Sequence, residues 1–200
     1  MFRFLTITFA VAFTRAVSGQ SIISEGKGFG TYYFDVDSIN ACRTTFENIT
    51  NGGVRCGHTT LLSLNDLSTN SVVAMNNTQL GADLALYCGK RVIVSVNNQE
   101  LDIPLFIGDG CERCSVGSSF AKEWNPDGAP GLDFSYTVLN KLAGGKACDA
   151  GYIDIAWKIV DETLHPFDVA STQLSKTTSI SKFPLSVPTQ GITSSRPCFV

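Results

Sequence analysis

The fold of this chain is decided by the stretch Cys88-Gly-Lys-Arg-Val-Ile-Val-Ser-Val-Asn-Asn98 and by the following Asp102-Ile-Pro-Leu-Phe-Ile-Gly-Asp-Gly-Cys-Glu-Arg-Cys114. Apolar residues recur at every second position in Val92–Val96 and again over residues 101–107, a period of two that is typical of β-strands. The pair Asn97-Asn98 stands between the two runs and predicts a tight turn. We therefore expect a β-hairpin here.

Three further segments have strand patterns and one has a helix pattern. The strands are expected at Gly30–Phe34, Ser71–Met75 and Tyr152–Val160. The helix follows Ser135, which can cap its first turn, and Gly144-Gly145 ends it. The sequence therefore predicts a mainly β protein with one or two short helices.

The chain divides into three parts by composition. Residues 1–19 have a basic start and an apolar run too short to cross a bilayer, which predicts a cleaved signal peptide and a secreted, extracellular protein without a membrane partner. Residues 26–161 contain one domain's worth of alternating apolar residues and turns. Residues 162–200 are rich in Ser, Thr and Pro and are expected to form a flexible tail.

Seven cysteines fit an oxidising compartment. Six of them are expected to form three disulfides whose pairing the sequence leaves open, and Cys198 in the tail is the expected leftover. The six are Cys42, Cys56, Cys88, Cys111, Cys114 and Cys148. Two sequons, at Asn48 and Asn76, are candidate sites for N-linked glycans.

Charge and histidine content limit the possible partners. The formal net charge is −3 and becomes about −5 without the two arginines of the predicted signal peptide, so nucleic acid is not an expected partner. Only His58 and His165 are present, neither at ligand spacing from Cys111-x-x-Cys114, and both are interpreted as surface residues. We therefore predict no metal and no cofactor.

Six short motifs occur in an order that resembles a known fold family. They are Gly30-Thr-Tyr-Tyr33, Val72-Val-Ala-Met-Asn76 with Gln79-Leu-Gly81, Cys88-Gly-Lys-Arg-Val-Ile-Val94, Gly108-Asp-Gly-Cys-Glu-Arg-Cys114, Leu132-Asp-Phe-Ser135 and Gly151-Tyr-Ile-Asp-Ile-Ala-Trp157. They resemble the blocks of the six-stranded double-psi β-barrel of expansins, loosenins, barwin-like proteins and the rare lipoprotein A domain. The resemblance covers roughly residues 28 to 161.

This resemblance implies a secreted module that binds a cell-wall polysaccharide, such as cellulose, another β-glucan or chitin, and loosens its contacts without hydrolysis. By motif, the catalytic positions fall on Asp133 and Asp109, and a substrate-binding threonine falls on Thr31. Tyr33 and Trp124 are aromatic candidates for stacking on sugars. Trp157 is interpreted as a core residue because it shares a strand face with isoleucines.

Two other functions stay open. Inverting glycosidases need a general acid and a general base, and here Asp133 would be the acid and Asp35 the base. Asp35 also fits the start of a turn, because Val36-Asp-Ser38 follows it. The remaining alternative is a secreted module that binds a protein, such as a protease inhibitor or an effector, because fold alone does not determine function.

Asp133 lies just before the predicted helix. The positive end of a helix favours the ionised carboxylate, whereas burial would raise the pKa of the same group. The sequence leaves both outcomes open.

Overall fold

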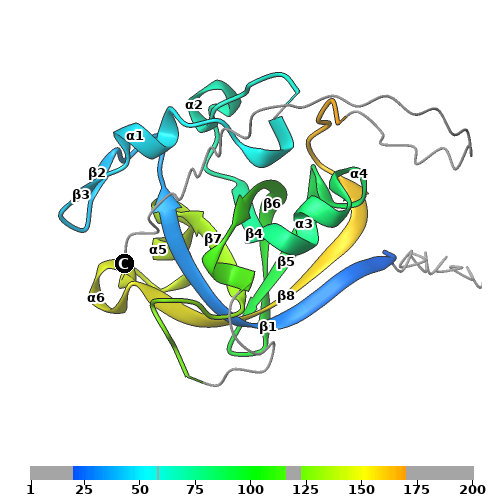
Figure 1. Cartoon of the computed structure of the whole chain (residues 1–200). Coiled ribbons are helices and arrows are strands. Elements are labelled where there is room, and N and C mark those ends of the chain that lie inside the picture. Colours follow the sequence, from blue (N-terminus) through cyan, green and yellow to red (C-terminus); the bar gives the residue numbers. More distant parts are fainter. Residues whose placement is uncertain (1–19, 58, 116–122, 170–200) are drawn as a thin grey trace, which may run out of the picture.

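The computed structural model describes residues 20–57, 59–115 and 123–169. The predicted signal peptide at 1–19, the histidine at 58 and Cys198 lie outside these residues. The described chain is mainly β, as the sequence predicts. Six strands close into a ring in the order β1-β7-β4-β6-β5-β8, and a separate two-stranded hairpin stands beside it (Figure 1).

The ring strands mix parallel and antiparallel pairs. β1 pairs in parallel with β7 and β4 pairs in parallel with β6, whereas the other four pairings are antiparallel. The ring strands are β1 (Ile22–Phe34), β4 (Val72–Asn76), β5 (Lys90–Val96), β6 (Gln99–Cys111), β7 (Gly131–Ser135) and β8 (Tyr152–Thr163). The small hairpin consists of β2 (Asn40–Ala41) and β3 (Thr44–Thr45).

The hairpin of β5 and β6 confirms the prediction from the opening stretch. Its turn residues Asn97 and Asn98 have φ angles of 52° and 64°, the left-handed conformation that a two-residue turn of this kind requires. Val96 and Gln99 are the strand residues that flank the turn and pair with each other.

The helices are short and more numerous than expected. The predicted helix is α5, where the Ser135 hydroxyl accepts a hydrogen bond of 3.2 Å from the Val138 N–H. Most of the others are single turns, which are too short to carry a helical period in the sequence. The helices are α1 (Glu47–Thr50), α2 (Leu64–Leu67), α3 (Asn77–Ala82), α4 (Leu84–Tyr87), α5 (Tyr136–Leu142) and α6 (Ala147–Ala150), with 3₁₀ turns η1 (Arg55–Gly57) and η2 (Arg113–Ser115).

The largest hydrophobic core fills the ring and determines which side chains point outward. On β7, Leu132 and Phe134 belong to this core, so Asp133 between them points to the outer face of the ring. On β4, Val73 and Met75 also belong to the core and leave Ala74 on the outer face. Because side chains alternate between the two faces of a strand, Asp133 and Ala74 both lie on the outer face, each between two core residues.

All six cysteines expected to pair do form disulfides. The bridges are Cys42–Cys148, Cys56–Cys88 and Cys111–Cys114. They close segments of very different length, with sequence separations of 106, 32 and 3 residues. No helix among the described residues is long and apolar enough to cross a membrane.

The packed structure continues past the domain boundary that composition predicts at residue 161. β8 ends at Thr163, and the Leu164 N–H then donates to the Gly89 carbonyl at 2.8 Å. His165 is not a simple surface residue, because its ring stacks on Phe106 with centroids 4.9 Å apart. Phe167 packs against the same cluster. The Ser- and Thr-rich composition of the predicted tail as a whole gave no sign of these contacts, which its first residues make.

Candidate functional site

A row of register partners crosses four strands on the outer face of the ring. Thr31 on β1 pairs with Asp133 on β7, Asp133 pairs with Ala74 on β4, and Ala74 pairs with Asp109 on β6. Register partners on neighbouring strands point to the same face of a sheet. The structure therefore brings together three of the residues that the sequence nominated, namely Thr31, Asp109 and Asp133.

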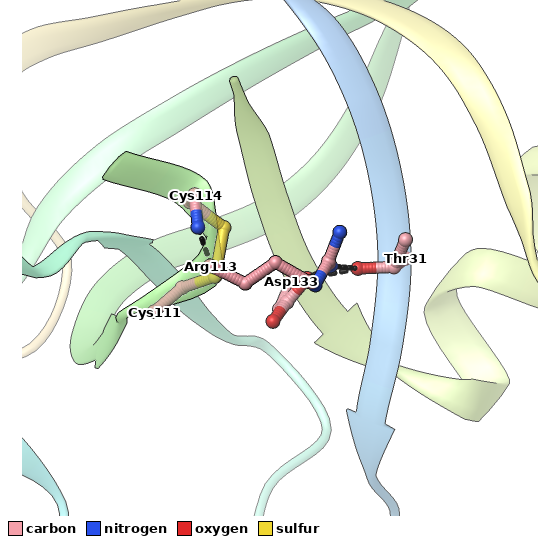
Figure 2. Close-up of polar contacts among 5 residues, drawn as sticks. All are labelled: Thr31, Cys111, Arg113, Cys114 and Asp133. Carbon is pink, nitrogen blue, oxygen red and sulfur yellow. Dashed lines mark hydrogen bonds and ion pairs between the residues drawn. A yellow bond between two sulfur atoms is a disulfide. The ribbon is translucent and has the colours of Figure 1, made fainter. Parts of the chain in front are cut away.

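Asp133 is held by two side chains. The Thr31 hydroxyl donates to Oδ1 of Asp133, and Nη2 of Arg113 donates to the same oxygen at 2.7 Å. Arg113 Nη2 also donates to the Thr31 hydroxyl oxygen, so the three side chains form a closed set of contacts. Figure 2 shows the arginine reaching from its disulfide-bonded loop to Asp133 and Thr31.

Burial decides the ionisation of Asp133. Its relative exposure is 2%, and that of Arg113 is 9%. Burial raises the pKa of the Asp133 carboxyl, although the nearby Arg113 charge and the Thr31 hydrogen bond both favour the charged form. Of the two outcomes that the sequence left open, the structure therefore favours the raised pKa, and desolvation is its cause.

Asp109 lies at the other end of the row and is also bonded. Its Oδ1 accepts from the N–H groups of Arg55 and Gly110, each at 2.8 Å, and the Tyr33 hydroxyl lies 3.3 Å from its Oδ2. Tyr33 reaches Asp109 from an irregularity of β1, where the register with β7 shifts between Tyr32 and Phe34. Asp109 and Asp133 are separated by one strand, β4, on which Ala74 is the register partner of both.

Arg113 is the central residue that the sequence analysis missed. It lies between Cys111 and Cys114, and their bridge closes a short loop that aims the arginine at Asp133. The sequence signal was a basic residue between two cysteines. It did not reveal the contact with Asp133, because residues 20 positions apart share no periodic pattern. The Cys111 and Cys114 sulfur atoms and a carboxylate oxygen of Asp133 lie within 4.8 Å of one another, yet the sulfurs are bonded to each other and offer no thiolate to a metal.

Trp124 extends the site through aromatic contacts. The Arg113 guanidinium lies 4.8 Å from the centroid of the Trp124 ring, a cation–π contact. Tyr152, the register partner of Thr31 on β8, stacks on the same ring with centroids 4.5 Å apart. The Phe29 ring also meets it edge-on, with centroids 5.4 Å apart. Trp124 therefore borders the site, and its ring already packs on three protein groups.

Asp35, considered above as a general base, forms its hydrogen bonds within the protein. It is fully buried, and its carboxylate accepts from the N–H groups of Asp37, Ser38 and Thr137 at 2.6–3.0 Å and from the Asn70 side chain at 3.2 Å. Three of these donors bind Oδ1 and the Thr137 N–H binds Oδ2, so both oxygens are engaged within the protein. Asp35 thus fixes the turn after β1 to the start of α5, as the alternative interpretation held.

The two sequons differ in their surroundings. Asn48 is exposed on α1, whereas Asn76 is half-buried and caps α3 through its Oδ1, which accepts from the N–H groups of Thr78 and Gln79. Trp157, interpreted as core, is half-buried at the border of the main core.

Comparison with known proteins does not assign the chain to a family. It matches no protein-family model, and no curated protein matches it significantly in sequence.

Proposed function

We propose that this protein is a secreted, expansin-like module that binds a cell-wall polysaccharide, such as a β-glucan or chitin, and loosens its contacts without hydrolysis. In this proposal the ring is a double-psi β-barrel. The two parallel pairings, β1 with β7 and β4 with β6, support it. Each joins two strands that do not follow each other in the chain, because other strands of the ring lie between them in sequence.

The observation that carries the proposal is the row Thr31–Asp133–Ala74–Asp109. It places the threonine and both aspartates of the expansin-like motifs on one face of the ring. Tyr33 lies at one end of the row and Trp124 with Tyr152 at the other, so aromatic rings border the acids on both sides. Acids flanked by aromatic rings suit a ligand with many hydroxyl groups and apolar ring faces.

A non-hydrolytic action fits the acids better than cleavage does. An inverting mechanism needs a carboxylate that can activate water, whereas Asp35 is fully buried and already accepts from four donors of the protein. Asp133 has a raised pKa, and its neutral form can donate a hydrogen bond to a glycosidic or hydroxyl oxygen. Such a bond competes with the contacts between polysaccharide chains and breaks no covalent bond.

Sedimentation with insoluble polysaccharides tests the proposal. The protein should sediment with cellulose, chitin or isolated walls and should weaken wall strips under load, while a reducing-sugar assay stays at background. Release of reducing sugar would replace the proposal with a glucanase. Failure to sediment with any of the three materials would reject it and favour a module that binds protein.

A further inference from the structure

A second, smaller site lies at the end of the ring where β4 ends and β7 begins. β7 starts at Gly131, opposite Phe29, so the first half of β1 has no β7 partner. A pocket of about 140 Å³ occupies the resulting gap between β1, β4 and α3. The mouth of a closed strand ring is a common place for a ligand.

The apolar walls of this pocket are fixed by packing. Met75 and Leu132, which line it, belong to the main core, and Trp157 packs against that core. The indole of Trp157 lies directly over Gly26, where an added Cβ would be 2.4 Å from Cζ2 of the ring. Trp157 therefore forms a rigid aromatic wall of the pocket.

Two amide side chains supply the polar wall. The Oδ1 of Asn76 is used by two backbone N–H groups, so its Nδ2 must point elsewhere. The Nε2 of Gln79 contacts the hydroxyls of Ser24 and Tyr87 at 3.1 and 3.0 Å, which fixes the Gln79 side chain. Within the part of the chain that the structure describes, Asn76 Nδ2 and Gln79 Oε1 have no partner. The pocket thus offers one donor and one acceptor.

Size and charge restrict the ligand. A volume of 140 Å³, the space of about four or five water molecules, is well below that of a pocket for an oligosaccharide or a nucleotide and is too small to enclose a whole sugar. It can hold one face or edge of a single ring while the rest of the ring stays in solvent. Glu25 and Lys27 at the rim carry opposite charges, which leaves the pocket close to neutral. The ligand should therefore be one small neutral ring that has an apolar face and adjacent hydroxyl groups.

We propose that this pocket binds a single pyranose ring, with its C–H face on Trp157 and its hydroxyls on Asn76 and Gln79. This inference deepens the proposed polysaccharide-binding function and rests on it for its biological role. The ring would be an end or side-branch residue of the polysaccharide. The first sugar of a glycan on Asn76 has the same chemistry and is the other possible source, because Asn76 is in a sequon.

The test is a titration of Thr78→Ala/Trp124→Phe with glucose, xylose and N-acetylglucosamine. Thr78→Ala removes the sequon but keeps Asn76 and its cap, and Trp124→Phe leaves Trp157 as the only tryptophan. We expect the fluorescence emission of Trp157 to change saturably, with half of the change reached at about millimolar sugar, which is typical of a small ligand. The melting temperature should rise with the same dependence on sugar.

Gln79→Leu in the same background should shift the half-point by about tenfold, because it removes one hydrogen bond. Gln99→Leu, at an exposed position of β6, is the matched control for sugar effects on the solvent and should behave like the parent.

The Trp124→Phe protein that retains Thr78 and carries its glycan distinguishes the two sources. If it responds as Thr78→Ala/Trp124→Phe does, an external sugar is the ligand. If it does not respond, the glycan on Asn76 already fills the pocket.

An unchanged emission together with equal melting shifts in the parent and Gln79→Leu would overturn the pocket proposal. The titration uses free sugars, so it is independent of sedimentation. A positive titration with no sedimentation would reject the proposed function and leave the pocket intact, and the reverse result would reject the pocket alone.

Discussion

Thr31 and Asp133 are register partners on the parallel strands β1 and β7, and the Thr31 hydroxyl donates to the Asp133 carboxylate. The two residues are 102 positions apart in the chain. Arg113 contacts both of them, so each member of the set orients the other two.

Thr31→Val keeps the shape of the side chain and removes its hydroxyl. We expect the free energy of unfolding to fall by about 1–3 kcal/mol, because the buried Asp133 and Arg113 both lose a partner. Urea denaturation measures this. Thr137→Val, at an exposed side chain on α5, is the control and should change stability little. Equal stabilities of the two variants would contradict the contact.

The raised pKa of Asp133 predicts a pH dependence of stability. A folded-state pKa above the ordinary value of 3.8 means that the folded protein binds the proton more tightly than the unfolded chain does. The stabilisation is therefore complete below that value and is lost as the pH rises through the folded-state pKa. In denaturation series across this acid range, Asp133→Asn should gain stability relative to the parent as the pH rises. A constant difference would contradict the raised pKa.

Local sequence patterns predicted the elements that depend mainly on interactions between neighbouring residues. Alternation predicted the β5–β6 hairpin, and the Ser135 cap with the Gly144-Gly145 end predicted α5. The first half of β1 was missed because Gly26 and Gly28 interrupt its pattern. The fold requires them, since a Cβ on Gly28 would lie 2.0 Å from the Pro130 carbonyl oxygen and one on Gly26 would enter the Trp157 ring.

Contacts between segments that are distant in the chain could not be predicted from the sequence. Six cysteines allow fifteen pairings, and only the folded ring selects one. The motifs placed Thr31, Asp109 and Asp133, but nothing local indicated that Arg113 would pair with Asp133 or that three backbone N–H groups would bind the Asp35 carboxylate. These roles depend on strand register, which forms only on folding.

Stability should depend unequally on the three disulfides. Loop-closure entropy predicts about 4.7 kcal/mol for Cys42–Cys148, which closes roughly 100 residues, and about 3.7 kcal/mol for Cys56–Cys88. Paired Cys→Ala variants of the two bridges, compared by urea denaturation, should follow this order. The reverse order would show that packing around the buried Cys56 and Cys88 outweighs chain entropy.

The domain boundary can be tested by truncation. A chain that ends at Asp161 loses Leu164, His165 and Phe167, and we expect it to lose about 3 kcal/mol of stability with their buried apolar surface. A chain that ends at Val169 keeps them and should melt like the full protein. Equal melting temperatures of the two truncated chains would show that these three residues do not stabilise the domain.

Removal of the Asp133 charge tests the central claim most directly, provided that Arg113 is treated with it. Asp133→Asn alone leaves the buried Arg113 without its carboxylate partner. Arg113→Met/Asp133→Asn removes both charged groups, so no unpaired buried cation complicates the comparison. Arg113→Met alone is the matched control that retains the acid.

The decisive measurement is the weakening of cell-wall strips by these variants, at equal amounts of folded protein shown by circular dichroism and melting. We expect Asp133→Asn and the double variant both to lose about tenfold in weakening, the equivalent of one hydrogen bond of about 1.4 kcal/mol, because an amide has no acidic O–H to donate. Full weakening by a folded Arg113→Met/Asp133→Asn protein would contradict it and would leave Asp133 as a buried structural acid.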